Sequence, residues 1–263
     1  MLWQELTAPE FAKAVKEVGG VCLLSIGCLE RHSEHLPLGT DFLVGFDICR
    51  LAAEKEPAIV FPPYYFGQIH EARCFPGTVA MGPVRTLELL MEICAEIARN
   101  GLNKIVLFNA HGGNKHLLGY LIETHLSSRK PYSIYLPGRL SEGRRKQWDA
   151  LMTTPYDYHA GQSETSISLA IHEHLVKMDK IIDNGQPQNR YARLPESFVT
   201  HGWYADYPNH YAGDARTASR EKGLQFRQLL VDSLAEYVQA VKDDTAVAAV
   251  AQEFYDRCDR VGQ

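Results

Sequence analysis

The feature that most constrains the fold is a set of short apolar runs separated by helical segments. GVCLLSIG at residues 20–27 and KIVLFNA at residues 104–110 are almost continuously apolar, which is typical of strands buried on both faces of a parallel sheet. Residues 59–61 and 132–136 have the character of shorter strands. Because parallel strands need crossover connections, these runs predict an α/β chain.

The segments between the apolar runs have the spacing of amphipathic helices. In residues 84–100 the apolar side chains form one stripe, and Gly101 follows as a suitable C-terminal cap. Further helices are expected at residues 42–55, 116–128, 161–176, 219–241 and 246–258. The alternation predicts a three-layer α/β/α sandwich with a mostly parallel central sheet. The sequence has no internal repeat and no linker-like stretch, so residues 1–263 are expected to form a single domain.

The composition argues against several classes of protein. The chain has 27 basic and 32 acidic residues and a net charge of -5 at pH 7, which disfavours nucleic acid or an anionic membrane as the main partner. No apolar run approaches the roughly 18 residues that a membrane-spanning helix needs, and no secretory signal pattern opens the chain. The six cysteines include no CxxC pair, so we expect free thiols in a reducing, cytoplasmic compartment.

Histidines and carboxylates gather in three segments that are expected to follow strands. Glu30 and His32 come after the first apolar run, and His111 comes directly after the run at residues 104–110. A third segment, DYHAGQSETS, holds His159 and Glu164 at the start of an expected helix. Because open α/β sheets bind ligands beyond the carboxyl ends of their strands, we expect these side chains to share one rim.

The residue types at this rim are those of a metal site. Glu30 and His32 are two residues apart, which puts both side chains on one face of an extended segment, and Asp41 stands where the next helix begins. A nitrogen and oxygen set without thiolate suits Zn²⁺, Mn²⁺ or Fe²⁺. A carboxylate such as Asp41 can bridge two cations, and a water ionised by them can attack a carbonyl. The alternative is that the histidines are structural and that HGGN is only a tight turn.

Five sequence runs carry a resemblance to a known family. IGCLERHSEHLPLGTD, FPGT, NAHGGN, HAGQSETS and TASREKG occur in this order across most of the chain, and together they resemble the creatininase (creatinine amidohydrolase) family. The resemblance implies a compact α/β/α sandwich, a metal site that is usually binuclear, and a cyclic homo-oligomer, often a hexamer. The family also includes deformylases, a peptide-trimming member and hydrolases of cyclic sugar-derived ketones, so membership does not fix the substrate.

The resemblance also implies roles for individual residues. The positions that match the metal ligands of the family are Glu30, His32, Asp41 and His111. Asp41 takes the bridging position, and Glu164 is similar to a further carboxylate at the site. His159 matches the histidine that passes a proton to the leaving group, which suits a side chain that titrates near neutral pH.

The chain departs from the family pattern at two places. The usual E-Q-H-G-x-H is E-R-H-S-E-H at residues 30–35, and residues 112–113 are Gly-Gly where creatininase has Tyr-Glu. The glutamate of that pair is a metal ligand in creatininase, so the second metal loses a ligand here. We expect Glu164 to replace it, with a single-metal site as the alternative. Creatinine is therefore not the expected substrate.

Other residues are expected to surround the metal site. Arg31, Glu34 and His70 are predicted to contact a polar, small-molecule substrate. His35 is predicted either to orient a ligand or to stabilise a turn, and Asn114 to cap the helix after HGGN. The aromatic loop that contains Trp203, Tyr204, Tyr207 and Tyr211 is predicted to be a lid or an oligomer contact.

The leading hypothesis from the sequence is a metal-dependent hydrolase of a C–N bond in a small cyclic or linear amide. The alternatives are a hydrolase of a cyclic, sugar-derived ketone or lactone, or a deformylase, on the same metal site. A non-enzymatic metal-binding protein would need neither His159 nor Glu164. The sequence has no GxSxG, Walker or GxGxxG pattern, which argues against serine hydrolases of the nucleophile-elbow type and against nucleotide-binding enzymes.

Overall fold

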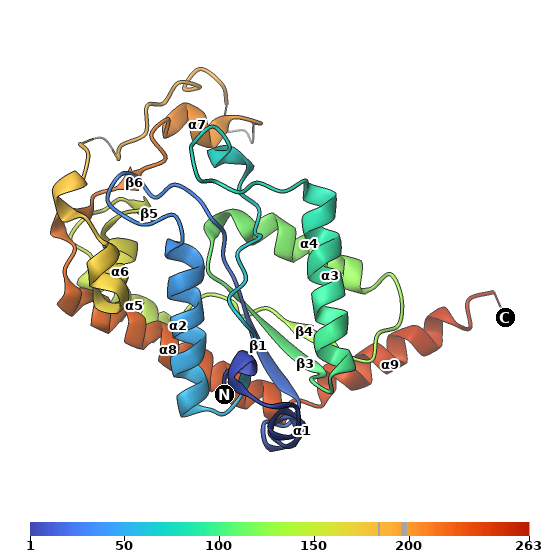
Figure 1. Ribbon diagram of the computed structural model, residues 1–263. Coiled ribbons are helices and arrows are strands. Elements are labelled where there is room, and N and C mark those ends of the chain that lie inside the picture. The colour runs from blue at the N-terminus through green and yellow to red at the C-terminus, as the bar shows by residue number, and fades with distance from the viewer. Residues whose placement is uncertain (184, 196–198, 263) are drawn as a thin grey trace.

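The centre of the fold is a four-stranded parallel sheet with the strand order β2-β1-β3-β4 (Figure 1). The computed structural model describes residues 1–183, 185–195 and 199–262. The strands are β1 (Val21–Ile26), β2 (Ile59–Val60), β3 (Lys104–Asn109) and β4 (Ser133–Tyr135). All four lie within the apolar runs predicted as strands, and the parallel pairing confirms the predicted class of sheet.

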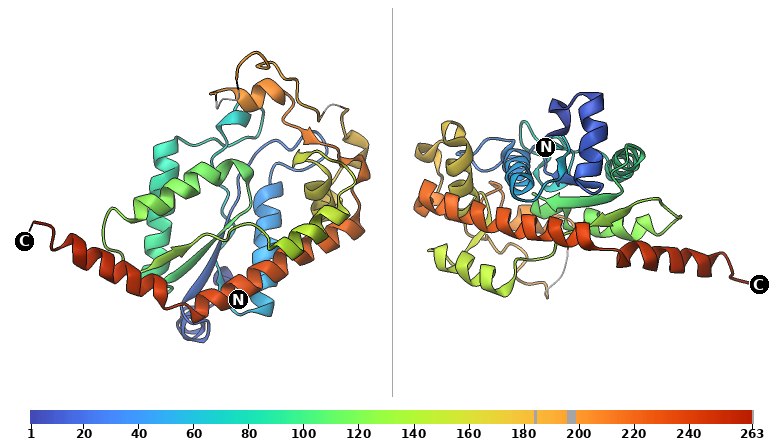
Figure 2. Two further views of the ribbon diagram at one scale, coloured as in Figure 1. Left: turned by 180° about the vertical axis from the view of Figure 1, so that it is seen from behind. Right: turned by 90° about the horizontal axis from the view of Figure 1, so that it is seen from below.

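Helices cover both faces of this sheet, and Figure 2 shows α3 and α8 on opposite sides of it. One face packs against α1 (Ala8–Glu17), α3 (Pro83–Arg99) and α4 (Lys115–His125), and the other against α2 (Thr40–Lys55) and α8 (Arg220–Asp243). Successive side chains of β1 alternate between these two cores, as the pleat requires. The predicted three-layer α/β/α sandwich is therefore confirmed.

The helix boundaries follow local chemistry. Pro83 lies in the first turn of α3, where a missing N–H costs nothing, and Gly101 adopts φ 91° just beyond its end. Three helices were not predicted from periodicity: α1, α5 (Glu142–Leu151) and α7 (Gly202–Asp206). The helix predicted at residues 161–176 is shorter, because α6 (Gln162–His172) is followed by a separate 3₁₀ turn.

A second, two-stranded sheet lies beside the main one. Its strands, β5 (Asp157–His159) and β6 (Ala212–Gly213), pair antiparallel. This corrects the expectation that all three polar segments follow strands of one parallel sheet, because the third begins in β5. The following helix, α6, packs closely against α8. The close approach depends on Gly223, because a Cβ at this position would overlap the carbonyl oxygen of Ser166. Because α8 also packs against the main sheet, this contact links the third segment to the sheet that carries the first two.

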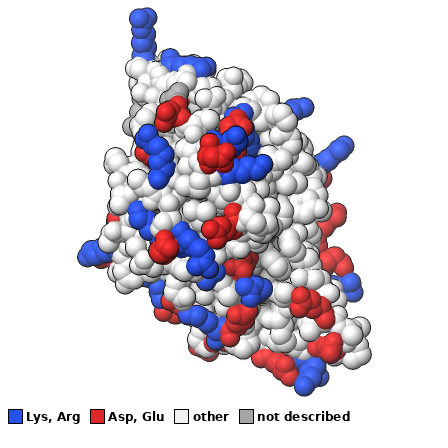
Figure 3. Space-filling view, turned by 60° about the vertical axis from the view of Figure 1, so that its left-hand side comes forward, with Lys and Arg blue, Asp and Glu red and all other residues white. Residues whose placement is uncertain are grey.

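The C-terminal helix α9 (Ala246–Cys258) extends away from the sheet (Figure 2) and matches its predicted bounds. The surface shown in Figure 3 mixes acidic and basic side chains without a large patch of one sign. All six cysteines are free, as predicted. Within the described part of the chain, no helix has both the length and the apolar character needed to cross a membrane.

Candidate metal centre

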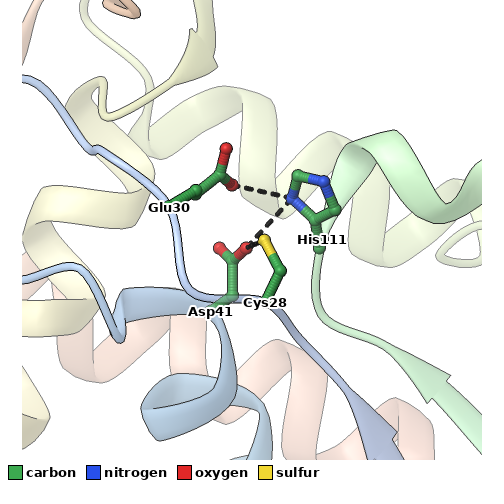
Figure 4. Close-up of side chains that lie close together, drawn as sticks. All are labelled: Cys28, Glu30, Asp41 and His111. Atoms are coloured by element: carbon green, nitrogen blue, oxygen red, sulfur yellow. Dashed lines mark hydrogen bonds and ion pairs between the residues drawn. The ribbon is translucent and has the colours of Figure 1, made fainter. Parts of the chain in front are cut away.

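Three side chains from separate elements meet at one nitrogen atom. Glu30 comes from the loop after β1 and Asp41 from the first turn of α2. His111 lies two residues after the end of β3 (Figure 4). His111 Nδ1 lies 2.8 Å from Glu30 Oε1 and 2.9 Å from Asp41 Oδ2. All three side chains are buried. These residues lie up to 81 positions apart in the sequence. They meet at the carboxyl ends of β1 and β3, as the rule for open α/β sheets predicts.

The spacing of these atoms suits a shared cation better than hydrogen bonds alone. An imidazole nitrogen carries at most one hydrogen, so His111 Nδ1 cannot donate fully to both carboxylates. Glu30 Oε1 is buried and makes no hydrogen bond of normal geometry. Nitrogen and oxygen ligands about 2 Å from one ion lie about 3 Å from each other. The residues present therefore fit a divalent metal ion.

Asp41 faces a second group of donors with its other oxygen. His32 Nε2 lies 3.0 Å from Asp41 Oδ1, whereas Asp41 Oδ2 faces His111. His32, Asp41 and Glu164 each offer one donor atom within 4.8 Å of the others. Asp41 thus lies between two groups of donors, which is the arrangement of a bridging carboxylate.

The charges in this pocket balance one another. Burial lowers the pKa of His32, but the Asp41 carboxylate outweighs it and the pKa is raised to about 10. For His111, burial likewise opposes protonation, but the Glu30 and Asp41 carboxylates raise the pKa well above its usual value. In the metal-free protein, the two carboxylates therefore favour the protonated form of both imidazoles. A cation bound here displaces those protons.

His159 is oriented by a backbone carbonyl. Its Nε2 lies 2.9 Å from the carbonyl oxygen of Arg31, which can only accept, so the ring proton is on Nε2 and Nδ1 is left as an acceptor. Burial lowers the pKa of His159 to about 3, so the ring is neutral. Its ring centroid lies 4.4 Å from that of His32. A pKa of about 3 makes His159 a weak base in the metal-free protein, unlike the near-neutral titration expected from the sequence, so its role in proton transfer stays a prediction.

Glu164 is held at the start of α6. Its Oε2 accepts a hydrogen bond of 2.6 Å from the backbone N–H of Ala160, and burial raises the pKa of Glu164 to about 7. This is the carboxylate expected to replace the ligand missing at residues 112–113. Its membership of the group with His32 and Asp41 is compatible with that expectation.

Cys28 lies in the cluster although the sequence analysis expected a donor set without sulfur. Its Sγ–H donates to Asp41 Oδ2 at 3.1 Å, and it groups with Glu30, Asp41 and His111. Burial, with the carboxylates of Asp41 and Glu30, raises the pKa of the Cys28 thiol well above its usual range. From the sequence, Cys28 was expected only to be a free thiol. Its position directly after the first apolar run, two residues before Glu30, was the signal that could have indicated a place at the rim.

His210 is the second residue that the sequence analysis missed. Its Nε2 lies 2.8 Å from Glu30 Oε2, and the Trp203 indole donates to its Nδ1 at 3.0 Å. A single histidine in an aromatic loop gave no signal for this role, since the contact spans 180 positions. This contact brings the aromatic loop to the cluster, and the role of the loop as a lid or an oligomer contact stays a prediction.

The residues predicted to contact substrate lie around the cluster but not in it. The Arg31 guanidinium lies over the Phe75 ring, 4.4 Å from its centroid, and pairs with Glu34. His70 begins the 3₁₀ turn His70–Ala72 and its Nδ1 lies 3.5 Å from Gln68 Nε2. None of the three predicted residues is in a metal-ligand group of the described chain. Their contact with substrate stays a prediction.

Two other expectations concern His35 and Asn114. His35 Nε2 hydrogen-bonds Thr165 Oγ1 at 2.9 Å, so it supports the helix turn that carries Glu164. The predicted capping role of Asn114 is wrong, because its side chain does not cap α4. Instead its Oδ1 accepts from the Gln68 N–H, and its Nδ2 donates to a carbonyl oxygen at the end of β1. The amide thus ties the rim of the sheet together.

Of the two glycines, Gly113 has a steric reason, whereas an added Cβ at Gly112 would meet open space. A Cβ at Gly113 would overlap His111 Nε2 and would lie 2.9 Å from both Gln68 Oε1 and Glu71 Oε1. His111 Nε2 in turn donates to the Gln68 carbonyl at 2.8 Å, which leaves Nδ1 facing the carboxylates. A larger residue at position 113 would require this loop to move.

Comparison with known proteins identifies the family. Residues 4–238 match the family Creatininase, described as creatinine amidohydrolase. The chain belongs to the creatininase family. The resemblance seen in the sequence motifs is therefore confirmed, and with it the prediction that the protein is a hydrolase.

Curated relatives from this family carry different names. Creatinine amidohydrolase of Pseudomonas putida is 26% identical over 258 residues, covering 89% of this chain and 95% of the relative. Mycofactocin precursor peptide peptidase of Mycolicibacterium smegmatis is 28% identical and covers 84% and 85%. 3-Dehydro-scyllo-inosose hydrolase of Thermotoga maritima is 22% identical and covers 92% and 83%. Family membership therefore does not identify the bond that this protein cleaves.

Solved creatininase structures share the fold. A crystal structure of creatininase superposes with a TM-score of 0.78 at 23% identity, covering 93% of this chain and 98% of that one. A creatininase structure described as Mn has a TM-score of 0.77 at 23% identity, covering 92% and 99%. Another, described as Zn-Zn type, has the same TM-score and identity and covers 92% and 98%.

Three of the four non-glycine residues with positive φ in the described part of this creatininase-family protein lie near the cluster, and the fourth, Asn189, is exposed. Ser33, Ala160 and His210 adopt φ values of 55°, 54° and 52°, in the left-handed region that favours glycine. Ser33 stands where the family pattern has glycine, and its buried hydroxyl has no hydrogen-bond partner. Such strain persists where the surrounding contacts determine the conformation, and it is typical of functional sites.

We expect Ser33→Gly to raise the free energy of unfolding of the metal-free protein by about 0.5–1 kcal/mol, because glycine adopts this φ without a Cβ penalty. Denaturant unfolding measures the change. Ser168→Gly is the matched control, since Ser168 also has a buried, unpartnered hydroxyl but lies inside α6. The control should be destabilised by about 0.5 kcal/mol. A loss of stability in both variants would contradict the assignment of strain to Ser33.

Proposed function

We propose that this protein is a metal-dependent hydrolase that cleaves a C–N bond of a small cyclic or linear amide with a metal-activated water. The observation that carries the proposal is the position of His111 Nδ1, within 2.9 Å of oxygens from both Glu30 and Asp41. A buried nitrogen between two carboxylates has the composition and spacing of a metal site. The family assignment supports hydrolysis as the reaction.

The proposed ligands form two groups that share Asp41. Glu30, Asp41 and His111 would hold one divalent ion, and His32, Asp41 and Glu164 would hold a second where one binds. Zn²⁺, Mn²⁺ and Fe²⁺ suit this donor set. Such ions lower the pKa of water and polarise carbonyl oxygens, which is the chemistry that amide hydrolysis needs.

His159 is the proposed proton carrier. With its Nε2–H bound to the Arg31 carbonyl, Nδ1 is free to accept the proton of the attacking water. The same atom can then deliver that proton to the leaving nitrogen, which departs as an amine. The bond to the backbone keeps the ring in the tautomer that both steps require.

A hydrolase of a cyclic, sugar-derived ketone or lactone, or a deformylase, is the second candidate function. It is supported by the name of one relative, the inosose hydrolase, which extends the family beyond amide substrates. It is also supported by the steric exclusion of a side chain at Gly113, where creatininase carries a metal-binding glutamate. The same metal site would serve these reactions.

The partners proposed for this protein are a small-molecule substrate and further copies of the chain. A hexamer is proposed from the resemblance to the family. A cytoplasmic location is proposed from the six free cysteines, which suit a reducing compartment. Arg31, Glu34 and His70 are proposed to contact the substrate.

A substrate panel with and without metal tests the proposed function. The purified protein is stripped with a chelator, divided, and reloaded with Zn²⁺, Mn²⁺ or buffer alone. Release of amine, formate and ring-opened acid is then measured over cyclic amides, formamides, short peptides and cyclic ketones. We expect amide cleavage only in the reloaded samples. Full activity of the stripped protein would refute the mechanism, and ketone opening without amide cleavage would select the second candidate.

Asp41→Ala should abolish binding of both ions, because Asp41 faces both groups of donors. Metal content per chain, measured by inductively coupled plasma mass spectrometry, checks this. Asp47→Ala is the control, since Asp47 lies in the same helix, pairs with Arg50 and belongs to neither group. Wild-type metal content in Asp41→Ala would show that another residue holds the two ions.

His159→Ala should lower kcat by about 10²–10⁴ while the metal is retained, because the proton transfer loses its carrier. His172→Ala is the control, since His172 lies at the end of α6 outside the metal-ligand groups. Steady-state kinetics on the best substrate of the panel, with metal content measured in parallel, give the comparison. Unchanged turnover would remove His159 from the reaction.

A further inference from the structure

A chain of two hydrogen bonds reaches Glu30 from the aromatic loop of residues 199–211. Trp203 lies in α7, and its indole N–H donates to His210 Nδ1 at 3.0 Å. His210 Nε2 lies 2.8 Å from Glu30 Oε2. His210 and Glu30 are 2% and 1% exposed, so water does not compete for these bonds.

The direction of both bonds follows from the indole. A tryptophan N–H can only donate, so His210 Nδ1 must be the acceptor. The proton of the neutral imidazole is then on Nε2, and Nε2–H donates to the Glu30 carboxylate. Trp203 thus selects the tautomer of His210 that can bind Glu30.

This bond divides the two oxygens of Glu30 between different partners. Oε2 accepts from His210, whereas Oε1 has no hydrogen bond of normal geometry and lies 2.8 Å from His111 Nδ1. The carboxylate therefore presents a single oxygen to the proposed metal position. Without His210, the carboxylate could rotate about its last side-chain bond and lose that orientation.

Packing holds the chain of bonds in place. The His210 ring lies 4.5 Å from the His159 ring and 5.7 Å from the Phe75 ring, measured between centroids. The Trp203 ring lies 4.6 Å from that of Tyr207. The backbone of His210 is held at φ 52°, a strained conformation that these contacts stabilise.

We propose that His210 and Trp203 are positioning residues for metal binding: His210 orients Glu30, and Trp203 acts through His210 by fixing its tautomer. The proposal rests on the metal site of the proposed function. It assigns a role in metal binding to two residues that do not contact the metal themselves. Partners of this kind, one step removed from the ion, typically change metal affinity by 10- to 100-fold.

Zinc affinity of the metal-free, full-length protein tests His210. A competition titration with a chromophoric chelator measures the dissociation constant of Zn²⁺ without any substrate. His210→Phe keeps a ring but removes both bonds, and we expect it to weaken zinc binding about 10- to 100-fold. His210→Gln returns an amide donor near the position of Nε2 and should recover most of the affinity. His125→Gln, at a histidine outside the metal-ligand groups, should leave zinc binding unchanged.

Trp203→Phe tests the second step. It removes only the indole N–H and should weaken zinc binding about 2- to 10-fold, the value of one hydrogen bond. Trp148→Phe is the matched control, because Trp148 packs on Phe226 away from the cluster, and should have no effect. In the His210→Phe background, Trp203→Phe should cause no further loss. An equal loss in both backgrounds would refute the action through His210.

The outcomes separate this inference from the proposed function. Wild-type zinc affinity in folded His210→Phe, with folding checked by circular dichroism and thermal unfolding, would overturn the positioning role. If His210→Phe does not fold, Trp203→Phe and His210→Gln decide the question with the same titration. Weakened zinc binding in a protein that cleaves no member of the substrate panel would leave the positioning role intact and refute the hydrolase. A wild-type protein that binds no zinc would refute both.

Discussion

Two carboxylates buried almost completely within a few ångströms of each other are the constraint on which the rest of the structure depends. Glu30 and Asp41 are 1% and 5% exposed. Burying two like charges is costly unless positive charge and hydrogen bonds surround them. His32 and His111 supply that charge when no metal is bound, and Cys28 and His210 supply hydrogen bonds. The same environment attracts a divalent cation.

The fold meets this constraint by bringing several elements to one end of the sheet. The parallel register of β1 and β3 places the loop of Glu30 beside His111, and α2 begins at the same edge with Asp41 in its first turn. The antiparallel pair β5 and β6 then carries His159 to the cluster from the other side. The aromatic loop closes over it through His210. The main sheet, helix α2, the second sheet and the aromatic loop therefore all contribute to one pocket.

Much of this could be predicted from the sequence because the relevant signals are local. Apolar runs identified the parallel strands, and the strand-end rule with the family motifs identified Glu30, His32, Asp41 and His111. Helix α1 was missed although Thr7 and Glu10 form a capping box at its start. That signal is local as well, and Phe11, Ala14 and Val15 have helical spacing and pack on the core, so this helix could have been predicted.

The remainder depends on tertiary contacts that no local pattern encodes. Cys28 directly follows an apolar run, and only the path of the chain beyond β1 places its thiol against Asp41. His210 meets Glu30 across 180 positions, and its role is determined by the indole of Trp203. The third polar segment was expected on the parallel sheet, but β5 pairs with a strand more than 50 residues later. Such pairings follow from the whole fold.

Anomalous diffraction at the zinc edge, from crystals of the zinc-loaded protein, tests the central claim most directly. The account predicts a strong peak among Glu30 Oε1, Asp41 Oδ2 and His111 Nδ1, with any second peak beside Asp41 Oδ1 and His32 Nε2. A fully loaded crystal with no peak in this pocket, or with its zinc held elsewhere on the chain, would contradict the account.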